Sequence, residues 1–514
     1  MKDKPRTHVE FLYLERDEAF CYDENMERDS AIAPWALQIA DEILQKQKDN
    51  LIACGVSPSG PFHLGHMREV ITADEIYKAI ISQGSKARLI YVADNFDSLR
   101  KVYPFLPSDF AKYVGWPLSK IPDPYGCHVS YDEHFLAPFF TSLKQLGIKL
   151  EVIYMDKMYQ SGQMTQVISI ALEKTSEIRE ILTRITSREI EQDWSPFAPL
   201  CPKCGKINAA KVINFDTKLH RVKYKCECGN EGEADYSKGE GKLSWRIDWP
   251  AHWKVLGVTV EPFGKDHAAA GGSWESGKEI CEKIFSFPSP FPIAYEWINL
   301  KGVGAMSSSK GTVATVDELL GIVPPQLFRM IITRTALNRH IDFDPGKGLM
   351  NLADEYSKSH PTTLPFRHLV NVVQASLGDL EEIKRQLEHS GHGKVVADET
   401  QLKVQVERAQ NWLEKFAPEE FKFEIQKEMP PVSLTPPQKQ LLAKIIELLG
   451  KETEAEKLHT QIYDAGRALG LEPRETFQPI YQLLLGKDSG PKAGWFLVML
   501  DKDFVIKRFK EAIE

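Results

Sequence analysis

One stretch near the start of the chain constrains the fold most, because it alternates strand, turn, helix and strand. Residues 51–57 form a short apolar run that suits a buried parallel strand. A turn rich in Pro, Ser and Gly follows at 58–61, then a helical pattern over 66–82 and a second strand candidate at 88–93. This order predicts a βαβ unit, whose two strands lie parallel in one sheet.

The alternation continues beyond this unit, with a strand candidate at 150–155 and a helical pattern over 163–190. Strand-like runs recur near 255–263 and 292–299. We therefore expect an α/β fold with a doubly wound parallel sheet of Rossmann type. From about residue 352 helical spacing dominates, with breaks at stretches that carry Pro or Gly, which predicts a separate all-helical domain.

Charge and hydropathy exclude several classes of protein. The chain holds 64 Lys and Arg against 72 Asp and Glu, a net charge of −8, which argues against a protein that binds nucleic acid indiscriminately. No run of about 18 consecutive apolar residues is present, so no membrane-spanning helix is expected. Acidic and polar residues, rather than an apolar signal core, follow Met1–Arg6, so we expect a cytoplasmic protein.

Four of the eight cysteines gather in two pairs, Cys201-Pro-Lys-Cys204 and Cys226-Glu-Cys228, and the other four are scattered. Two such pairs can complete the tetrahedral Cys₄ shell of a structural zinc site, and four incidental thiols are the alternative. Residues 201–228 carry seven basic and two acidic side chains. That excess is compatible with a finger that contacts phosphates or with an ordinary solvated surface.

Two glycine-bearing segments have the chemistry of a nucleotide site. The turn after the first strand reads Ser57-Pro-Ser-Gly-Pro-Phe-His63-Leu-Gly65-His66. Helix N-terminal amides favour anions, glycine permits close approach, and imidazoles can donate hydrogen bonds to phosphate oxygens, although two histidines could also merely cap a helix. Far downstream, a Gly/Ser loop over 302–311 carries a single lysine, Lys310, and could wrap a triphosphate or be a flexible surface loop.

Together these segments resemble the HIGH and KMSKS signatures of class I aminoacyl-tRNA synthetases. HIGH corresponds to His63–His66, and KMSKS corresponds to Ala305–Ser309 with Lys310 next, so the loop's positive charge rests on Lys310. Their particular form resembles the class I lysyl-tRNA synthetase family of archaea and some bacteria, over nearly the whole chain. The other stretches that carry this resemblance are Asp94–Val102, Trp245–Pro250, Gly264–His267, the cysteine pairs and Gly486–Lys492.

The resemblance implies an ATP-dependent lysine–tRNA ligase, which forms lysyl-adenylate and then transfers lysine to tRNA(Lys). It implies ATP with Mg²⁺ and lysine as substrates, tRNA(Lys) as partner and a structural Zn²⁺. His63, His66 and Lys310 would be the catalytic groups that contact the phosphates. The implied ATP-binding residues are Pro58, Gly65, Met306, Ser307, Ser308 and Ser309.

A lysine pocket must neutralise an ε-ammonium group and offer an aromatic wall to the aliphatic stem. We expect Asp94 and Asp97 to contact the ammonium groups, because they follow the carboxyl end of the second strand, where such sheets bind ligands. The remaining pocket residues that the resemblance implies are Gly55, Ser57, Trp245, His267 and Tyr295.

Each of these residues also has a purely structural interpretation. Trp245, Trp249 and Trp253 recur every four residues and could form the buried face of one helix. His267 could be a buried structural histidine, and the two aspartates could cap a turn or pair with Arg100. The sequence leaves these alternatives open.

The length of 514 residues suggests three or four domains. The helical domain would bind the anticodon arm of the tRNA, where Trp495 and Phe496 could stack an unpaired base or, as their apolar run favours, form core. The predicted divisions are an N-terminal extension at 1–33, the two halves of a Rossmann-type catalytic domain at 34–191 and 241–300, a zinc-knuckle insertion at 192–240, a KMSKS-like loop and stem-contact region at 301–351, and a helical anticodon-binding domain at 352–514.

Three other functions remain compatible with parts of this pattern. A glutamyl-type synthetase of the same class would share the helical anticodon-binding domain. A non-catalytic tRNA-binding paralogue would keep the fold without adenylate formation, although the intact His63, His66 and Lys310 argue against it. A nucleotidyltransferase would share the His-x-Gly-His segment but would leave the C-terminal helices without a purpose.

Overall fold

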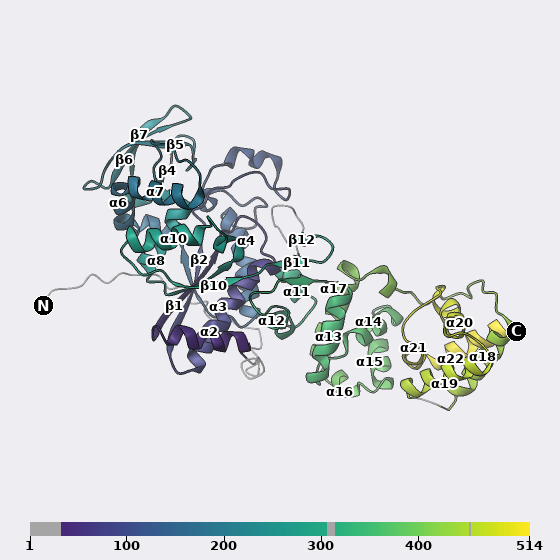
Figure 1. The fold of residues 1–514 in the computed structure, drawn as a ribbon. Helices are drawn as coiled ribbons and strands as arrows, with labels where there is room; N and C mark the ends of the chain where they lie inside the picture. Colours follow the sequence, from purple (N-terminus) through teal and green to yellow (C-terminus); the bar gives the residue numbers. More distant parts are fainter. Residues whose placement is uncertain (1–31, 306–313, 452–453) are drawn as a thin grey trace. The chain divides into compact units, whose positions relative to one another are not determined.

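The computed structural model describes residues 32–305, 314–451 and 454–514 (Figure 1). The chain divides into two compact units. The first comprises the chain up to Leu320 together with Phe328–Asp342, and the second comprises Gly321–Leu327 and Phe343–Glu514. No helix within these described ranges combines the length and the apolar character needed to cross a membrane.

A five-stranded parallel sheet forms the centre of the first unit, in the order β10-β9-β1-β2-β3. The chain runs outward from β1 to β3 and then returns to add β9 and β10 on the other side, so the strand order reverses between β1 and β9. Such a switch point is where open α/β sheets bind ligands, and the order confirms the predicted Rossmann-type fold. The strands are β1 (Asp49–Val56), β2 (Lys86–Ala93), β3 (Glu151–Tyr154), β9 (Val260–Gly264) and β10 (Phe291–Tyr295).

The core of the first unit gathers around the middle of the sheet. Ala53 of β1 and Ile90 of β2 belong to one buried cluster with Trp253 of α8 and Cys281 of α10. The helix α3 connects β1 to β2, packs against β1, β2 and β9, and is itself covered by α2. The helices are α2 (Pro34–Leu44), α3 (Leu64–Ser82), α4 (Tyr131–Gln145), α5 (Met155–Gln160), α6 (Thr165–Glu173), α7 (Thr175–Thr186), α8 (Trp245–Leu256), α9 (Lys265–Ala268), α10 (Ser273–Lys283) and α11 (Val316–Leu320).

Small antiparallel sheets carry the insertions of this unit. The cysteine-bearing insertion contains a two-stranded sheet and a three-stranded sheet. A further three-stranded sheet has the order β12-β11-β13, and its strands β11 and β12 lie before and at the start of the Gly/Ser loop. The strands are β4 (Phe197–Pro199), β5 (Ala210–Asp216), β6 (Arg221–Cys226), β7 (Glu231–Asp235), β8 (Gly241–Leu243), β11 (Ile298–Leu300), β12 (Gly304–Ala305) and β13 (Ile341–Phe343).

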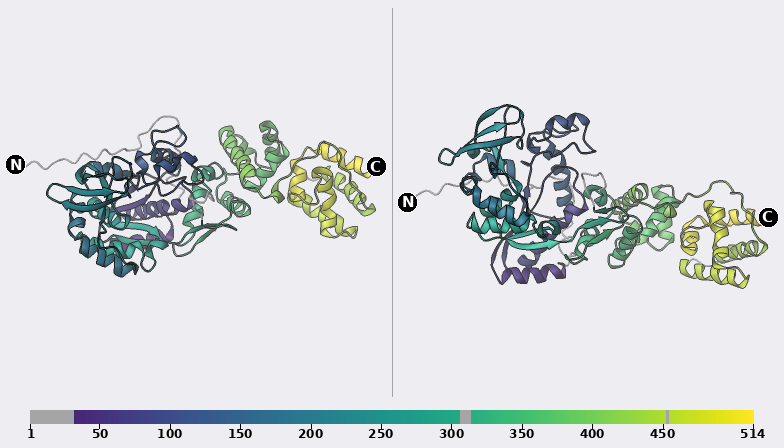
Figure 2. Two further views of the ribbon diagram at one scale, coloured as in Figure 1. Left: turned by 90° about the horizontal axis from the view of Figure 1, so that it is seen from above. Right: turned by 45° about the horizontal axis from the view of Figure 1, so that its top comes forward.

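After β13 the described part of the chain forms only helices, as the sequence predicts (Figure 2). The chain passes between the two units around α12 (Pro325–Thr333) and β13. The helices that follow are α13 (Lys347–Ser359), α14 (Phe366–Ala375), α15 (Leu380–His389), α16 (Gly393–Val396), α17 (Glu399–Lys415), α18 (Pro436–Leu449), α19 (Ala455–Ala468), α20 (Pro473–Leu485), α21 (Ala493–Met499) and α22 (Lys502–Ile513).

Two local expectations differ from the structure. The single helical pattern over 163–190 is two helices, α6 and α7, separated at Lys174. The strand-like run near 255–263 begins inside α8, which ends where Gly257 adopts a left-handed φ of 78°. A side chain with a Cβ atom is strained in that conformation, so glycine is the residue that allows the helix to stop and β9 to begin.

Candidate nucleotide and amino-acid site

His63 and His66 cap the N-terminus of α3 reciprocally. The backbone N–H of Gly65 donates to Nδ1 of His63 at 3.1 Å, and the backbone N–H of His63 donates to Nδ1 of His66 at 3.2 Å. The two rings stack with centroids 3.8 Å apart. Because each Nδ1 atom accepts a hydrogen bond, each neutral ring carries its proton on Nε2, which remains a hydrogen-bond donor.

Burial keeps both imidazoles uncharged. It lowers the pKa of His63 to about 4, and burial together with the neighbouring His63 lowers the pKa of His66 well below its ordinary value. Gly65 is required between them, because a Cβ atom there would lie 2.9 Å from the His63 ring. At neutral pH this helix terminus therefore offers backbone amides and two neutral Nε2–H donors, a combination that suits phosphate oxygens.

The chain that follows the Gly/Ser loop lies directly against this helix terminus. Thr315 forms an antiparallel bridge with His63, and the N–H of Leu64 donates to the carbonyl of Ala314 at 3.3 Å. The predicted ATP-contacting residues Met306, Ser307, Ser308 and Ser309 and the predicted catalytic Lys310 lie outside the described residues.

A half-buried carboxylate that the sequence analysis missed joins two of the predicted pocket residues. Oε1 of Glu69 accepts from the backbone N–H of Gly55 at 2.8 Å, and its Oε2 accepts from the hydroxyl of Tyr295 at 2.8 Å. Gly55 is the second-last residue of β1 and Tyr295 is the last residue of β10, so Glu69 links the carboxyl ends of two strands to α3. Burial raises the pKa of Glu69 to about 7. In the sequence, the feature that could have identified Glu69 was its position one helical turn after His66.

Aromatic side chains from α8 and α9 lie together in the same unit. The Trp245 ring stacks on Trp249 with centroids 5.4 Å apart, and the His267 ring lies 6.1 Å from Trp245. Trp249 and Trp253 are buried, which agrees with the structural interpretation of the tryptophan repeat, whereas Trp245 is half-buried at the first residue of α8. Nδ1 of His267 is 2.5 Å from the hydroxyl of Ser273. Trp245 is therefore the member of the repeat with surface left to offer a ligand.

The two aspartates after β2 have different environments. Asp97 accepts from the ammonium group of Lys242 at 2.5 Å, and that buried ammonium group also lies 3.0 Å from Asp248. Asp94 is buried, and its Oδ1 has no hydrogen-bond partner among the described residues. Burial and the nearby Asp97 raise the pKa of Asp94 well above its ordinary value. Asp97 is therefore already neutralised from within the protein, and Asp94 is the carboxyl group with an uncommitted oxygen.

Two further predicted residues complete this end of the sheet. Ser57, directly after β1, is half-buried, and its carbonyl accepts from the N–H of Ser59. Pro58 is buried beside it. The structure thus gathers Gly55, Ser57, Pro58, Glu69 and Tyr295 around the switch point of the sheet.

Known proteins match this chain over most of its length. Residues 33–375 match the family model described as "tRNA synthetases class I (K)", where K stands for lysine, and residues 406–513 match an anticodon binding domain. The chain belongs to the class I lysyl-tRNA synthetase family. This confirms the resemblance, and the glutamyl-type alternative is not favoured.

Three of the similar curated proteins come from archaea. A lysine–tRNA ligase of Archaeoglobus fulgidus is 43% identical, over 93% of this chain and 100% of its own length. Lysine–tRNA ligase 1 of Methanosarcina acetivorans is 42% identical, over 93% and 98% of the two chains. A lysine–tRNA ligase of Thermoplasma volcanium is 39% identical, over 93% and 99%. The likeness therefore includes both the sheet domain and the helices.

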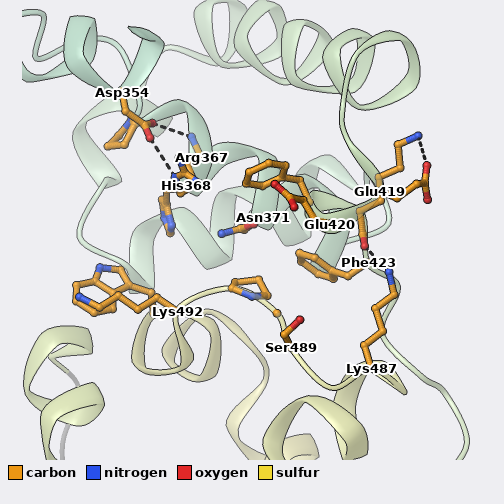
Figure 3. Close-up of a pocket in the computed structure, with 16 residues that line it drawn as sticks. Asp354, Arg367, His368, Asn371, Glu419, Glu420, Phe423, Lys487, Ser489 and Lys492 are labelled. Carbon is orange, nitrogen blue, oxygen red and sulfur yellow. Dashed lines mark hydrogen bonds and ion pairs between the residues drawn. The ribbon is translucent and has the colours of Figure 1, made fainter. Parts of the chain in front are cut away.

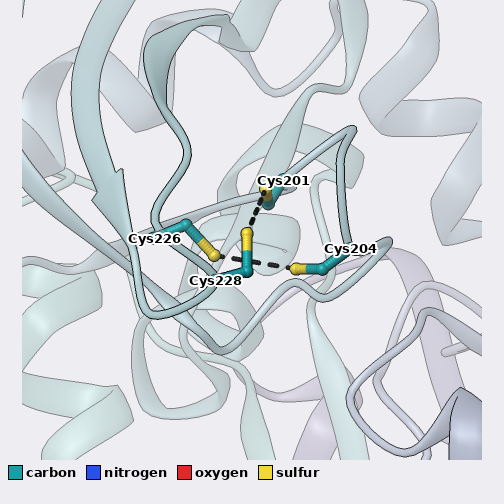
Figure 4. Close-up of side chains that lie close together, drawn as sticks. All are labelled: Cys201, Cys204, Cys226 and Cys228. Atoms are coloured by element: carbon teal, nitrogen blue, oxygen red, sulfur yellow. Dashed lines mark hydrogen bonds between the residues drawn. The ribbon is translucent and has the colours of Figure 1, made fainter.

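The four clustered cysteines of this class I synthetase have the spacing of a tetrahedral metal shell (Figure 4). Sγ of Cys201 is 3.7 Å from Sγ of Cys228, and Sγ of Cys204 is 3.6 Å from Sγ of Cys226. A tetrahedral site with Zn–S bonds of about 2.3 Å has sulfur atoms about 3.8 Å apart. The amide of Asn230 also donates to Cys201 at 3.6 Å. The residues present therefore fit a structural zinc ion.

The basic side chains around this cluster are largely paired. Lys211 contacts Glu191 and Asp193, and two acidic residues of β7 pair with three more: Glu233 contacts Arg221 and Lys223, and Glu231 contacts Lys225. Four of the seven basic side chains of this window are thus in ion pairs. The positive excess within 201–228 is thus offset by residues outside that window. This arrangement agrees with a solvated surface more than with a finger dedicated to phosphates.

A second group of metal-ligating side chains lies in the loop before α4 and in the first turn of α4, and the sequence analysis missed it. The ligand atoms of Asp123, Cys127, His128 and His134 all lie within 4.8 Å of one another. Sγ of Cys127 is 3.1 Å from Nδ1 of His128 and 3.2 Å from Nδ1 of His134. The signal in the sequence was the close spacing of one Asp, one Cys and two His. Mixed N, O and S ligands of this kind suit zinc.

Proposed function

We propose that this chain is an ATP-dependent lysine–tRNA ligase that works in the cytoplasm on tRNA(Lys). Membership of the class I lysyl-tRNA synthetase family and relatives named lysine–tRNA ligases along 93% of the chain support the proposal. The observation that carries it is the pair of neutral histidines at the N-terminus of α3, bridged to the chain that leaves the Lys310 loop. The proposed domains are an N-terminal extension at 1–33, the halves of the catalytic domain at 34–191 and 241–300, the zinc-knuckle insertion at 192–240, the loop region at 301–351 and the anticodon-binding domain at 352–514.

In the first step, a carboxylate oxygen of lysine attacks the α-phosphorus of ATP, and the bond to the bridging oxygen of pyrophosphate breaks. The Nε2–H groups of His63 and His66 donate to the phosphate oxygens as negative charge develops there. Lys310 closes over the β- and γ-phosphates, and Mg²⁺ accompanies the nucleotide. The implied ATP contacts are Pro58, Gly65, Met306, Ser307, Ser308 and Ser309. In the second step, a ribose hydroxyl at the tRNA terminus attacks the lysyl carbonyl and AMP leaves.

Lysine lies, in this proposal, at the carboxyl ends of β1, β2 and β10. Glu69 and Asp94 supply the carboxyl groups that face its ammonium groups, and Trp245 supplies the wall for its aliphatic stem. Asp97 acts on the bound lysine only indirectly, because its carboxylate is already paired with Lys242. The other contacts that we propose are Gly55, Ser57, His267 and Tyr295.

The decisive measurement is amino-acid-dependent pyrophosphate exchange across the twenty amino acids. Lysine alone is expected to give exchange. Exchange with glutamate but not lysine would establish the glutamyl-type alternative, and tRNA binding without any exchange would establish a non-catalytic paralogue.

Lysine activation is expected to depend on the ionisation of Glu69. Its pKa of about 7 is raised by burial, so the carboxylate is present above neutral pH and is lost as the pH falls. Because an ammonium group binds the carboxylate better than the neutral acid, kcat/KM for lysine should fall about tenfold for each pH unit below 7. The pH dependence of exchange between pH 5.5 and 8.5 measures this.

The variant Glu69→Gln should abolish the fall in kcat/KM below pH 7 and raise KM for lysine by a factor of about 10 to 100, since one charge-assisted contact is lost. The exposed Glu42 offers a matched control, Glu42→Gln, in which kcat/KM should still fall below pH 7. An unchanged fall at low pH in Glu69→Gln would assign the ionisation to another group.

We propose that the Cys₄ cluster and the Asp123 cluster each hold one Zn²⁺. The purified chain is then expected to contain about two zinc ions by elemental analysis. Cys204→Ser should remove one of them and lower the melting temperature of the first unit, and Cys127→Ser should remove the other. The buried Cys281 lies outside both clusters, so Cys281→Ser should keep both ions. Equal zinc content in Cys204→Ser and the unsubstituted chain would refute the assignment of that cluster.

A further inference from the structure

A pocket of about 530 Å³ lies in the second unit (Figure 3). Its walls are α14, the segment Glu419–Phe423 and the loop Lys487–Lys492, and the last two of these walls fall within the matched anticodon binding domain. The pocket therefore belongs with the proposed binding of tRNA. The first unit, in contrast, holds a buried acidic side chain that neither step of the proposed reaction uses.

That side chain is Glu261 of β9. It is 5% exposed, and β9 lies between β1 and β10 in the sheet, beside the switch point. Its Oε1 accepts from the indole N–H of Trp249 at 3.0 Å, and its Oε2 has no hydrogen-bond partner among the described residues. Burying a carboxyl group with one oxygen unpaired costs free energy that a hydrocarbon side chain of similar size would not. The packing of the sheet alone therefore does not account for a glutamate at this position.

Trp249 joins Glu261 to the aromatic side chains of the proposed lysine site. The Trp249 ring stacks on the Trp245 ring with an angle of 14° between their planes, and its centroid lies 5.3 Å from that of His267. Trp249 is buried, so it offers little surface to a ligand itself. The half-buried Trp245 and His267 therefore pack on a ring that Glu261 contacts.

The hydrogen bond to Glu261 fixes the orientation of the Trp249 ring. An indole has a single donor, Nε1–H, and the torsion that turns its ring has a broad energy profile, so packing alone defines the ring plane less tightly. Glu261 belongs to β9, whereas Trp249 and Trp245 belong to α8, so the bond also ties this helix to the sheet. Loss of the bond would allow Trp249 to tilt and would displace the Trp245 ring that stacks on it.

The electrostatic surroundings favour a role through Trp249 over a direct contact between Glu261 and lysine. Burial raises the pKa of Glu261 well above its ordinary value, the hydrogen bond from Trp249 opposes this, and Glu69 and Asp94 raise the pKa further. A carboxyl oxygen accepts a hydrogen bond in either protonation state, whereas strong attraction of an ammonium group requires the charged form. The contact with Trp249 therefore does not depend on the ionisation of Glu261.

We propose that Glu261 is a positioning residue for the recognition of lysine. By holding Trp249, it keeps Trp245 and His267 where they can line the aliphatic stem of the amino acid. It thereby sets the affinity for lysine rather than the rate of adenylate formation. The inference rests on the proposed function, because it takes Trp245 and His267 as lysine contacts.

The test measures lysine-dependent pyrophosphate exchange by full-length variants. Glu261→Met removes the acceptor and should raise KM for lysine about tenfold, with kcat and KM for ATP within about twofold of the unsubstituted chain. Glu261→Gln keeps an oxygen that accepts from Trp249, so its KM for lysine should stay within about twofold. Glu282→Met is the matched control, because the exposed Glu282 also accepts one side-chain hydrogen bond, from Ser289 at 2.8 Å, and its loss should leave KM unchanged.

Trp249→Phe tests the same hydrogen bond from the other side, because it keeps an aromatic ring and removes the donor. Combined with Glu261→Met, it should raise KM for lysine no further than the stronger single change, since both changes break one bond. A rise in Glu261→Gln as large as that in Glu261→Met, or a double variant that shows the product of the two single effects, would overturn the proposal and assign Glu261 a direct contact with lysine. An unchanged KM in Glu261→Met would overturn it as well.

Near-ultraviolet circular dichroism of the ligand-free variants separates this inference from the proposed function. Stacked indoles contribute to that spectrum, so Glu261→Met should change it and Glu261→Gln should preserve it. Identical spectra for Glu261→Met and the unsubstituted chain would show that Glu261 does not orient the tryptophans. Absence of lysine exchange in the unsubstituted chain would instead overturn the proposed function, while the spectra would still decide whether Glu261 holds Trp249.

Discussion

The substitution His66→Ala is expected to lower kcat/KM for lysine-dependent pyrophosphate exchange by a factor of about 10² to 10³. In the structure, Nδ1 of His66 is occupied by the backbone N–H of His63, so only its Nε2–H can act on a ligand. Burial keeps the ring neutral, and a neutral donor in a dry site stabilises developing phosphate charge without a change of protonation. Exchange measured at saturating ATP and lysine, and again below KM, separates this effect from weakened binding.

Two conservative variants separate catalysis from helix capping. His66→Asn keeps an acceptor close to the position of Nδ1 and removes the distal donor, whereas His66→Gln places an amide donor near the position of Nε2. His66→Asn should therefore be nearly as inactive as His66→Ala, and His66→Gln should recover part of the activity. If His66→Asn exchanges lysine as the unsubstituted chain does, the imidazole only caps α3.

The substitution Lys242→Met is expected to destabilise the first unit by about 3–5 kcal/mol, because it leaves buried carboxylates without their cation. Lys242 is 5% exposed, its ammonium group lies between Asp97 and Asp248, and Asp94 is close enough to influence its charge. These charges raise the pKa of Lys242, although burial opposes them. Denaturant or thermal unfolding followed by tryptophan fluorescence should show an earlier first transition, since six of the chain's ten tryptophans lie between Trp194 and Trp297.

The exposed Lys238 gives the matched control for this prediction. Its ammonium group pairs with Asp235 at 3.3 Å in solvent, so Lys238→Met should change stability by less than about 1 kcal/mol. The difference in the free energy of unfolding between Lys242→Met and the unsubstituted chain should also decrease as the pH falls, because protonation removes the unpaired negative charges. Coincident unfolding of Lys242→Met and Lys238→Met at neutral pH would show that the buried ammonium group contributes nothing.

The sequence was sufficient for features whose signal is local. The run at 51–57, the turn with His63 and His66, and the helical spacing over 66–82 predicted β1 and α3 within a few residues, because backbone periodicity is set by near neighbours. The same holds for the two cysteine pairs. Their short spacing places sulfur atoms in a tight turn, whatever the rest of the chain does.

The resemblance to the family identified the pocket residues but not the side chains that contact them. Gly55 and Tyr295 were both expected in the pocket, yet the group that joins them, Glu69, is one of many acidic residues and belongs to no motif. Glu69 could be identified only once it was known which face of α3 packs against the sheet. Trp249 and Trp253 belong to the core for the same reason, whereas Trp245, in the same repeat, remains partly accessible.

By itself, the sequence determined the α/β class, the helical C-terminal part, the family and the chemistry of the histidine turn. Only the tertiary structure decided which charges meet. Lys242 neutralises Asp97 from 145 residues away, Glu69 meets Tyr295 from 226 residues away, and β7 supplies the acids that pair with the basic strand β6. Long-range pairings of this kind depend on the strand order and on burial, which strongly favour one charged partner over the others. The spacing of residues along the sequence does not indicate which partner is favoured.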